Sequence, residues 1–403
     1  MRSTLPASPP AGSPAATAPS AGVSLLLVLL ALAGFAATTW LVGWRQGLLW
    51  CIGVGLGFAL AAASFGFTTG WRAWITDRDP TGMLAQFFAI AVCMVLSVPL
   101  LASHPELQGA DGPLSWSLLV GSFVFGASMQ VADGCGSGTL YKAGSGHPVS
   151  MAVLPAFVLG SFLGSLQLPA WLSLGALPPV SLVQRWGAPT TLLVQLGVLA
   201  ALAVLLWRLR NPQAPRRWQG PAVWIGGAAL GVLGALSLVV SGQPWGIVYG
   251  LGLWGAKIAQ ALGVNLSHNA FYGLPIQQAQ LHASVLADNT SISDLGMLFG
   301  ALIAAQRMGR LCPRLRLPRR ALLASVLAGV TMGYSSRLAF GCNVGAYFSG
   351  IATGSLHGWV WFGCAFLGSL LGVRLRARLG VGAARAAGPE AGGVPAAAAG
   401  VAR

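Results

Sequence analysis

Long apolar stretches recur along the whole chain, separated by short polar or basic segments. A helix needs about 20 apolar residues to cross the core of a bilayer. Stretches of about that length lie at residues 21–43, 48–66, 83–103, 114–132, 149–167, 189–207, 221–241, 284–306, 321–341 and 355–373. We therefore expect an all-α polytopic membrane protein, with the first stretch retained as a helix rather than cleaved as a signal peptide.

Composition and charge agree with a membrane protein. The 403 residues are 55% hydrophobic and only 8% charged, against about 25% charged in a typical soluble domain, which excludes an ordinary cytosolic enzyme. The net charge of +15 resides largely in basic clusters where apolar stretches end, as the positive-inside rule describes. No nucleic-acid-binding motif accompanies the charge, so we expect the bilayer as partner and no nucleic acid.

Charge and polarity also divide the chain into segments. Residues 1–20 and 379–403 contain too little apolar surface to fold and are expected to be disordered tails. Between them we expect a first half at 21–207, a basic cytoplasmic linker at 208–220 and a second half at 221–378. The linker, the loop from Arg307 to Arg320 and the Arg374–Arg378 segment are expected on the cytoplasmic side, and the loop from His104 to Gly112 on the outer side.

Four apolar stretches end in Gly-rich sequence instead of a charged loop. They run into Gly66, Gly134, Gly246 and Gly341, which is typical of broken or re-entrant helices whose ends are buried in protein. We expect such breaks to mark a site.

Two of these breaks resemble each other. Residues 126–135 (GASMQVADGC) align without gaps on residues 333–342 (GYSSRLAFGC), with five of ten positions identical, and Gly138 and Gly345 both lie three residues after the cysteine. The charge pattern places the two hairpins in opposite orientations. We therefore expect an inverted-topology repeat whose broken helices meet near the bilayer midplane.

Cys135 and Cys342 carry the candidate chemistry. A helix that restarts at a break leaves free backbone N–H groups and a positive dipole end, which suit an anion. A thiol there is either an S–H donor to a sulfur anion or, as a thiolate, a nucleophile or ligand for a soft metal. The candidate binding set is Cys135, Cys342, Gly134, Gly136, Gly138, Gly341, Asn343 and Gly345.

Charged residues near the breaks add to this set. Lys142 and Arg337 are close in sequence to the breaks; either they are functional charges at membrane depth, where a charge is costly, or their side chains extend to the membrane interface and anchor the helix there. Asp133 is either a proton or ion ligand or a helix cap. A metal site built from Cys135, Cys342, His147 and His357 is an alternative, although the cysteine-to-histidine spacings of 12 and 15 residues differ and match no common zinc motif.

The segments FGFTTGWR at 65–72, GCGSGTLY at 134–141 and LAFGCNVGAYFSG at 338–350 resemble the signature segments of the YeeE/YedE family of sulfur-transport membrane proteins, which includes thiosulfate importers. The resemblance covers about residues 45–378. It implies an hourglass of inverted halves in which central cysteines pass thiosulfate across the membrane through S–H hydrogen bonds. Cys135 and Cys342 match two of three relay cysteines in that family.

The third relay cysteine is missing here. The corresponding break reads Ala63-Ser64-Phe65-Gly66, so Ser64 is a candidate stand-in and Phe65 a candidate lining residue. The departure resembles the YedE-like branch, some members of which are associated with selenium metabolism.

Together these features predict a bacterial inner-membrane transporter for a small sulfur- or selenium-containing anion, without a cofactor and without enzymatic activity. A membrane sulfurtransferase that forms a cysteine persulfide and a metal-binding structural subunit are the alternatives. Import of a dianion against 100 mV costs about 4.6 kcal/mol, from 2.3 per charge. Because no sodium-binding set is visible, we expect consumption inside, with a cytoplasmic sulfur-carrier protein as partner.

Overall fold

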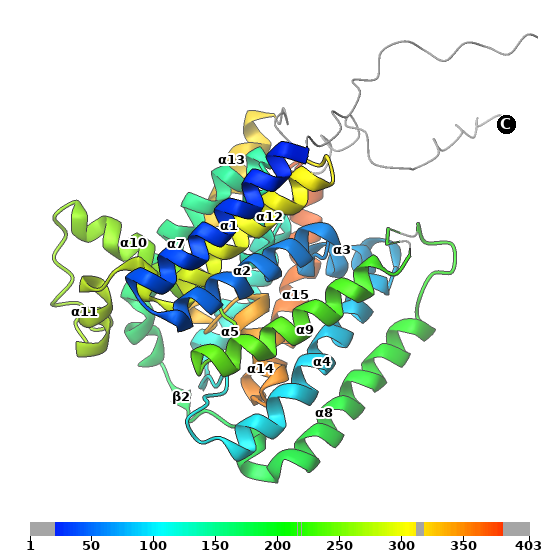
Figure 1. The fold of residues 1–403 in the computed structure, drawn as a ribbon. Helices are drawn as coiled ribbons and strands as arrows, with labels where there is room; N and C mark the ends of the chain where they lie inside the picture. Colours follow the sequence, from blue (N-terminus) through cyan, green and yellow to red (C-terminus); the bar gives the residue numbers. More distant parts are fainter. Residues whose placement is uncertain (1–20, 216, 219, 312–317, 382–403) are drawn as a thin grey trace, which may run out of the picture.

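The computed structural model describes residues 21–215, 217–218, 220–311 and 318–381, and about three-quarters of the described chain is helical (Figure 1). The long helices are α1 (Ala21–Leu41), α2 (Trp44–Ala62), α4 (Thr81–Ser103), α5 (Trp116–Val131), α7 (Pro148–Leu172), α8 (Leu182–Arg208), α9 (Ala222–Ser241), α10 (Val248–Ala261), α12 (Asn289–Arg307), α13 (Arg319–Leu338) and α15 (Leu356–Arg378). The short ones are α3 (Phe67–Asp77), α6 (Gly136–Gly144), α11 (Pro275–His282), the 3-10 turn η1 (Val285–Ala287), the π-helical turn η2 (Asn343–Phe348) and α14 (Ser349–Ala352). Strands β1 (Leu114–Ser115) and β2 (Ala176–Leu177) pair antiparallel.

Eight helical stretches in the described chain are long and apolar enough to cross a membrane. They are α1, α2 with α3, α4, α5 with α6, α7, α8, α9 and α15. The protein is therefore an all-α, multi-pass membrane protein, as the sequence predicts. The stretches predicted at 284–306 and 321–341 form α12 and α13, which are more polar and are not among these eight; α12 packs on α2, and α13 packs on α7 and α5 with one face exposed at Leu323 and Leu327.

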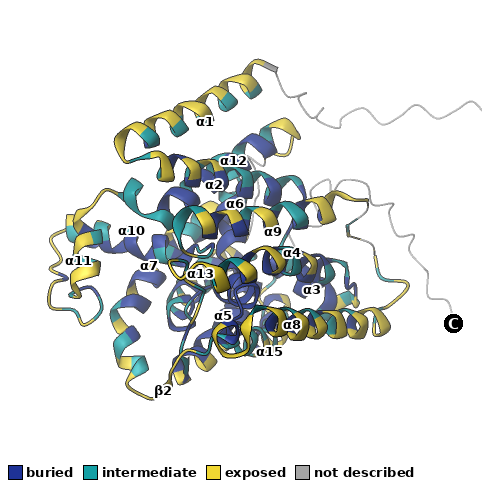
Figure 2. Cartoon of the chain, turned by 60° about the horizontal axis from the view of Figure 1, so that its bottom comes forward, coloured by how far each residue is buried: buried dark blue, intermediate teal, exposed yellow. Residues whose placement is uncertain are grey.

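The outer surface of the helix bundle is apolar, as expected of a surface that faces lipid rather than water. In Figure 2 the outward faces of α1 and α8 are exposed, and most of the buried residues lie on the helices between them. The exposed side chains are large and apolar, including Leu25, Leu32, Leu193 and Trp207. A bilayer covers such a surface without the cost that water would impose.

Glycines allow the inner helices to touch backbone to backbone. A Cβ on Gly57 of α2 would lie 2.0 Å from the Met297 carbonyl oxygen, and one on Gly300 of α12 would lie 1.9 Å from that of Val54. Small residues at such crossings are typical of membrane helices. The α2–α12 contact therefore depends on glycine from both sides.

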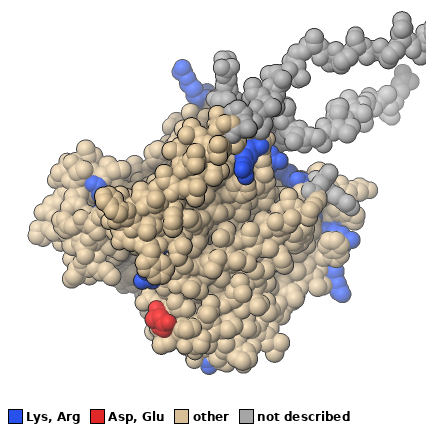
Figure 3. Space-filling view, viewed as in Figure 1, with Lys and Arg blue, Asp and Glu red and all other residues tan. Residues whose placement is uncertain are grey.

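The two ends of the bundle differ in charge. At the basic end, Arg217 pairs with Asp77 at 2.5 Å and Arg310 donates to Ser64 Oγ at 3.3 Å. The opposite end, which we call the outer end after its predicted orientation, carries the acidic residues Glu106 and Asp111 in the loop at 104–112. Figure 3 shows Lys and Arg concentrated on one side of the visible surface. Membrane orientation remains a prediction.

Parts of the predicted division lie outside the described residues: tail 1–20, residues 382–403 of the second tail, Arg216 in the linker, and Arg314 and Arg316 in the following loop. Leu379 to Val381, predicted as tail, form a turn directly after α15. The boundaries of the two halves remain predictions.

The predicted broken helices are confirmed. Helices α2, α5, α9 and α13 end at residues 62, 131, 241 and 338, and new helices begin at residues 67, 136, 248 and 343. The apolar stretches predicted at 48–66 and 321–341 extend four and three residues past the helix ends at 62 and 338. The reason is that the turns contain buried apolar residues such as Phe65 and Ala339, so apolarity alone does not mark where the helix ends.

Candidate functional site

Three of the breaks share one backbone turn. Ser64, Asp133 and Phe340 each follow the helix end by two residues and adopt a left-handed conformation, with φ of 48°, 62° and 57°. The next residue, Phe65, Gly134 or Gly341, donates its N–H to the carbonyl five residues earlier. This Schellman pattern satisfies carbonyls at the helix end and reverses the chain within four residues.

The cysteines occupy equivalent positions in two of these turns. Cys135 is the N-cap of α6, and Cys342 is the N-cap of η2. Cys342 Sγ accepts a hydrogen bond from the Val344 N–H at 3.4 Å, and Cys135 Sγ lies 3.4 Å from Ser137 Oγ. Both thiols are free and at most 1% exposed. Each sulfur therefore lies where a helix N-terminus begins.

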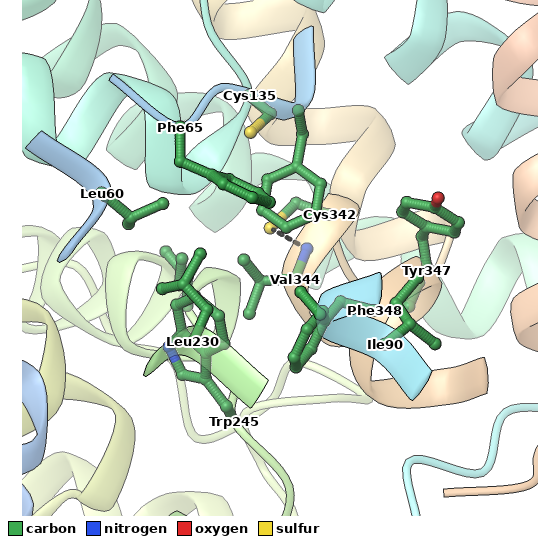
Figure 4. Close-up of a cluster of buried hydrophobic side chains, with 14 of the residues drawn as sticks. Leu60, Phe65, Ile90, Cys135, Leu230, Trp245, Cys342, Val344, Tyr347 and Phe348 are labelled. Atoms are coloured by element: carbon green, nitrogen blue, oxygen red, sulfur yellow. Dashed lines mark hydrogen bonds between the residues drawn. The ribbon is translucent and has the colours of Figure 1, made fainter. Parts of the chain in front are cut away.

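The two thiols are neighbours in one buried cluster. A Cβ added to Gly136, the residue after Cys135, would lie 2.9 Å from Cys342 Sγ. In Figure 4 both sulfurs point toward Phe65. Around them pack Leu60, Val344, Phe348, Leu230 and Trp245. In this state an apolar cluster closes the centre of the molecule.

A cavity of about 570 Å³ opens at the outer end of the bundle, and we call it the vestibule. It is lined by residues of the Cys342 break, Phe340 and Gly345, together with Trp245, His357 and Arg337. Among the described residues, no carboxylate lies within ion-pair distance of Arg337. Its Nε donates to Ser165 Oγ at 2.7 Å, and its guanidinium lies over Tyr249. The vestibule therefore offers a positive charge to an entering anion.

An acidic residue at the rim of the vestibule, Asp111, reduces the local positive charge when its carboxyl is ionised. Asp111 lies in the outer loop and lines the cavity. Burial raises the pKa of the Asp111 carboxyl, partly offset by a hydrogen bond from Ser355. The rim therefore becomes less negative as the pH falls through that pKa.

A cluster of ion pairs surrounds the Cys135 break on the opposite side. Asp133 Oδ1 lies 2.9 Å from Arg72 Nη1 and 3.1 Å from Arg376 Nη1, and Asp133 Oδ2 lies 3.2 Å from Lys142 Nζ. Lys142 also donates to the Asp133 carbonyl. All four side chains are at most 15% exposed. We call these four residues the inner cluster; it gathers three cations from α3, α6 and α15.

Most of the predicted residues lie at the two cysteine breaks. Gly134 and Gly341 form the turns, and Gly341 has a φ of 152° that suits only glycine. Gly136 lies against Cys342, and Gly138 is 3.7 Å, measured from an added Cβ, from Cys135 Sγ. Asn343 is buried, and neither of its amide atoms has a hydrogen-bond partner in the described chain. A side chain of this kind is available to a ligand.

Ser64, by contrast, does not lie in the buried centre with the other predicted residues. It is exposed at the basic end, where its Oγ accepts from Arg310. In the shared turn Ser64 corresponds to Asp133 and Phe340, whereas Gly66 holds the N-cap position of the two cysteines. Within this chain, Gly66 rather than Ser64 therefore has the position equivalent to Cys135 and Cys342, and a role for Ser64 in place of a third cysteine stays a prediction. Phe65 remains in the centre.

The four-ligand metal site is not formed. The described residues contain no group of three or more His, Cys, Asp or Glu side chains that could hold a metal ion. His357 lies beside the vestibule with Nδ1 2.8 Å from Ser355 Oγ, and His147 Nδ1 lies 3.4 Å from Ser150 Oγ on α7. Each histidine therefore has a local hydroxyl neighbour.

Sequence reasoning missed two members of the inner cluster. Arg72 appears there only within a motif, and Arg376 only as part of a basic tail. Arg72 follows the N-cap Gly66 by six residues and Lys142 follows the N-cap Cys135 by seven, and this similar placement of a cation in the second turn of the returning helix was the available signal. For Arg376 no local signal exists.

Comparison with known proteins gives a consistent result. The sequence model of the family described as "Sulphur transport" matches residues 62–371. The chain is 27% identical over 336 residues to a thiosulfate transporter TsuA of Spirochaeta thermophila, covering 78% of this chain and 93% of that protein. It is 25% identical over 340 residues to TsuA of Escherichia coli, covering 79% and 90%.

Over a shorter part of the chain, the identity to another relative is higher. Over 148 residues the chain is 31% identical to a probable transporter YedE of Salmonella typhimurium. The match covers 36% of this chain and spans only 35% of the length of that protein.

Proposed function

Because the chain belongs to the sulphur transport family, we propose that it carries a small sulfur-containing anion, thiosulfate or a related sulfur or selenium species, across the bacterial inner membrane. The observation that carries the proposal is a pair of free, buried thiols at the starts of two returning helices, with cations on either side. Relatives that match most of the chain are named as thiosulfate transporters.

The route begins in the vestibule. Arg337 attracts the anion by charge, and its aromatic neighbours keep the guanidinium in place. Phe340 and Gly345 form part of the cavity wall beside the Cys342 break. An anion in the vestibule therefore contacts residues that lie two and three positions from Cys342 in the sequence.

The thiols then carry the anion through the apolar centre. A neutral S–H group donates a weak hydrogen bond without the desolvation cost of a full charge. The backbone N–H groups at the N-termini of η2 and α6 add donors that suit an anion. Since Cys342 and Cys135 are neighbours, the anion passes from one to the other, and it stays chemically unchanged.

The inner cluster receives the anion. Lys142 lies on the same short helix that Cys135 caps, and Arg72 and Arg376 complete the set. Charged groups in a membrane interior are expensive and usually mark an ion pathway. From there the anion is released to the cytoplasm, where a sulfur-carrier protein or sulfurtransferase consumes it.

Reciprocal packing supports an inverted repeat as the framework for this route. Helix α5 packs on α15 and α13 packs on α7; likewise α2 packs on α12 and α9 packs on α4. Gly126 and Gly333, aligned in the sequence repeat, are the contact points: an added Cβ would lie 2.0 Å from the Ala365 carbonyl oxygen and 2.2 Å from that of Phe157. Each half thus supplies the helix on which the other half's broken helix rests.

Uptake of sulfur-35 thiosulfate into importer-deficient cells tests the proposal. We expect Cys135→Ser and Cys342→Ser each to lower uptake at least about tenfold, since a shorter hydroxyl replaces the soft donor at a site where about 1.4 kcal/mol of lost transition-state stabilisation is tenfold. Cys93→Ser is the matched control, because Cys93 is buried in α4 and contacts Ser97.

Competition with selenite and sulfite identifies the preferred anion. Native uptake in both cysteine variants, with expression confirmed, would contradict the route. A gain of one sulfur atom on either cysteine during turnover, seen by mass spectrometry, would instead support a persulfide-forming enzyme.

A further inference from the structure

Asp294 is a carboxylate in the membrane interior that the proposed route does not use. It lies on α12, is completely buried, and neither carboxylate oxygen has a hydrogen-bond partner among the described residues. A Cβ on Gly250, in the first turn of α10, would lie 3.1 Å from Asp294 Oδ2. Ionisable residues without a partner at membrane depth are rare, and they mark ion or proton routes.

The position of Asp294 on α12 connects two parts of the proposed route. Thr290 lines the vestibule, Asp294 follows one turn later and Leu298 one turn after that, so all three share a helix face. The Leu298 carbonyl oxygen would lie 2.3 Å from a Cβ on Gly144 of α6. This face therefore runs from the outer cavity to the helix that carries Lys142.

The surroundings of Asp294 do not neutralise a carboxylate. The titratable or charged residues on the elements packed against α12 are Tyr249 and Lys257 on α10, Tyr141 and Lys142 on α6, and Arg45 and Cys51 on α2, while α1 and η1 contain none. In the described chain the groups whose charges interact with Asp294 are Asp288 and Cys342. Lys257 instead donates to the carbonyls of Leu281 and Ala283.

We propose that Asp294 binds a proton from the vestibule and releases it inward with each anion that is carried. The inference rests on the proposed transport of a sulfur anion. On the outer side a proton adds to the carboxylate, and on the inner side the carboxyl returns it to water. Each proton that accompanies a dianion cancels one of the two charges moved against the membrane potential, which halves the electrical cost of entry, and an inward proton gradient then contributes to uptake.

The donor set favours a proton over a metal cation. A proton needs one oxygen, whereas a cation such as sodium needs several. The same added Cβ on Gly250 would lie 3.1 Å from Ser291 Oγ, a hydroxyl oxygen that already accepts a hydrogen bond from Trp254 Nε1 at 2.9 Å.

The test uses the purified full chain in liposomes that contain a pH-sensitive dye, with sulfur-35 thiosulfate outside and the membrane potential clamped at zero. For the native chain, an outside-acid gradient of one pH unit should raise the accumulation ratio about tenfold if one proton accompanies each anion, since one pH unit is a tenfold proton ratio. Addition of thiosulfate should also acidify the lumen.

Asp294→Asn keeps a neutral side chain of the same shape. It should retain the exchange of labelled for unlabelled thiosulfate within about twofold, while gradient-driven accumulation falls to a ratio near one and the dye signal disappears. Asp79→Asn is the matched control, because Asp79 is a buried acid at the basic end and its Oδ1 accepts from the Thr81 N–H. It should behave like the native chain.

The outcomes separate the two proposals. If the native chain shows no exchange, the proposed function fails and the proton inference with it. If the native chain exchanges thiosulfate but ignores the proton gradient, or follows a sodium gradient, only the proton inference is overturned. If D294N aggregates, Asp294→Glu replaces it: a displaced carboxyl should keep exchange and lower the accumulation ratio severalfold, and native accumulation would overturn the assignment.

Discussion

The Cys342 break and the Cys135 break have the same backbone turn but different surroundings. At the left-handed position the outer break carries Phe340, and the inner break carries Asp133. The outer break adjoins an open cavity with Arg337. The inner break is surrounded by three cations that already share one carboxylate.

This difference suggests two distinct tasks for the two sides. At the outer side a cation beside an open cavity captures an anion from water. At the inner side the Asp133 carboxylate occupies the cations, so an arriving anion must compete with it and leaves again when Asp133 returns. The same turn thus presents a thiol in both places, while the neighbouring charges decide between capture and release.

Removing the outer cation is expected to have the larger effect. Arg337→Gln should raise the KM for thiosulfate uptake about tenfold, equivalent to about 1.4 kcal/mol of lost binding, with Vmax nearly unchanged. Initial rates over a range of concentrations measure both values. Arg45→Gln is the control, because Arg45 lines a separate cavity at the same end. An unchanged KM would contradict capture by Arg337.

Removing the inner carboxylate is expected to have an intermediate effect. Asp133→Asn leaves three cations without their internal competitor, so the anion should be held longer: Vmax should fall about fivefold and KM should fall with it. Asn tolerates the left-handed conformation. Ser64→Asn, at the same position of the α2–α3 turn, is the control. A raised KM with native Vmax would show that Asp133 does not act in release.

The smallest expected effect concerns pH at the vestibule rim. Because burial raises the pKa of Asp111, the carboxyl becomes neutral as the pH falls through that pKa, and anion binding should improve. We expect KM to fall about twofold over that range for the native chain and to stay flat for Asp111→Asn. Exchange is measured with equal pH on both sides, so that no proton gradient acts through Asp294.

Glu106→Gln, which removes an outer carboxylate paired with His104 at 3.0 Å, is the control for the pH experiment. If Asp111→Asn keeps the full pH response, another group is responsible and the role given to the rim is wrong.

The sequence reveals the helices and the breaks because both have local signatures. Apolar length predicts a membrane span, and the Gly-rich ends at residues 66, 134, 246 and 341 predict the breaks. The cysteine pair is found because the repeat around it is gapless. What local pattern does not provide is the register inside the turn, and for that reason Ser64 is favoured although Gly66 holds the equivalent position.

The inner cluster and Asp294 depend on contacts between distant parts of the chain. Arg72, Asp133 and Arg376 meet only because α3 and α15 pack beside the Cys135 break. Asp294 lies in a stretch whose pattern predicts an ordinary apolar helix. That its carboxylate has no hydrogen-bond partner among the described residues becomes clear only when the packing of α12 against α10 is known. Spatial proximity of this kind has no sequence signature.

The shared turn also makes the number of thiols along the route independent of the fold. At Gly66 the backbone is extended, with a φ of −127° that any residue adopts, and the nearest atom to an added Cβ is the Thr69 hydroxyl oxygen at 2.9 Å, on a side chain that can rotate. A cysteine can therefore be gained or lost at this position by one codon change.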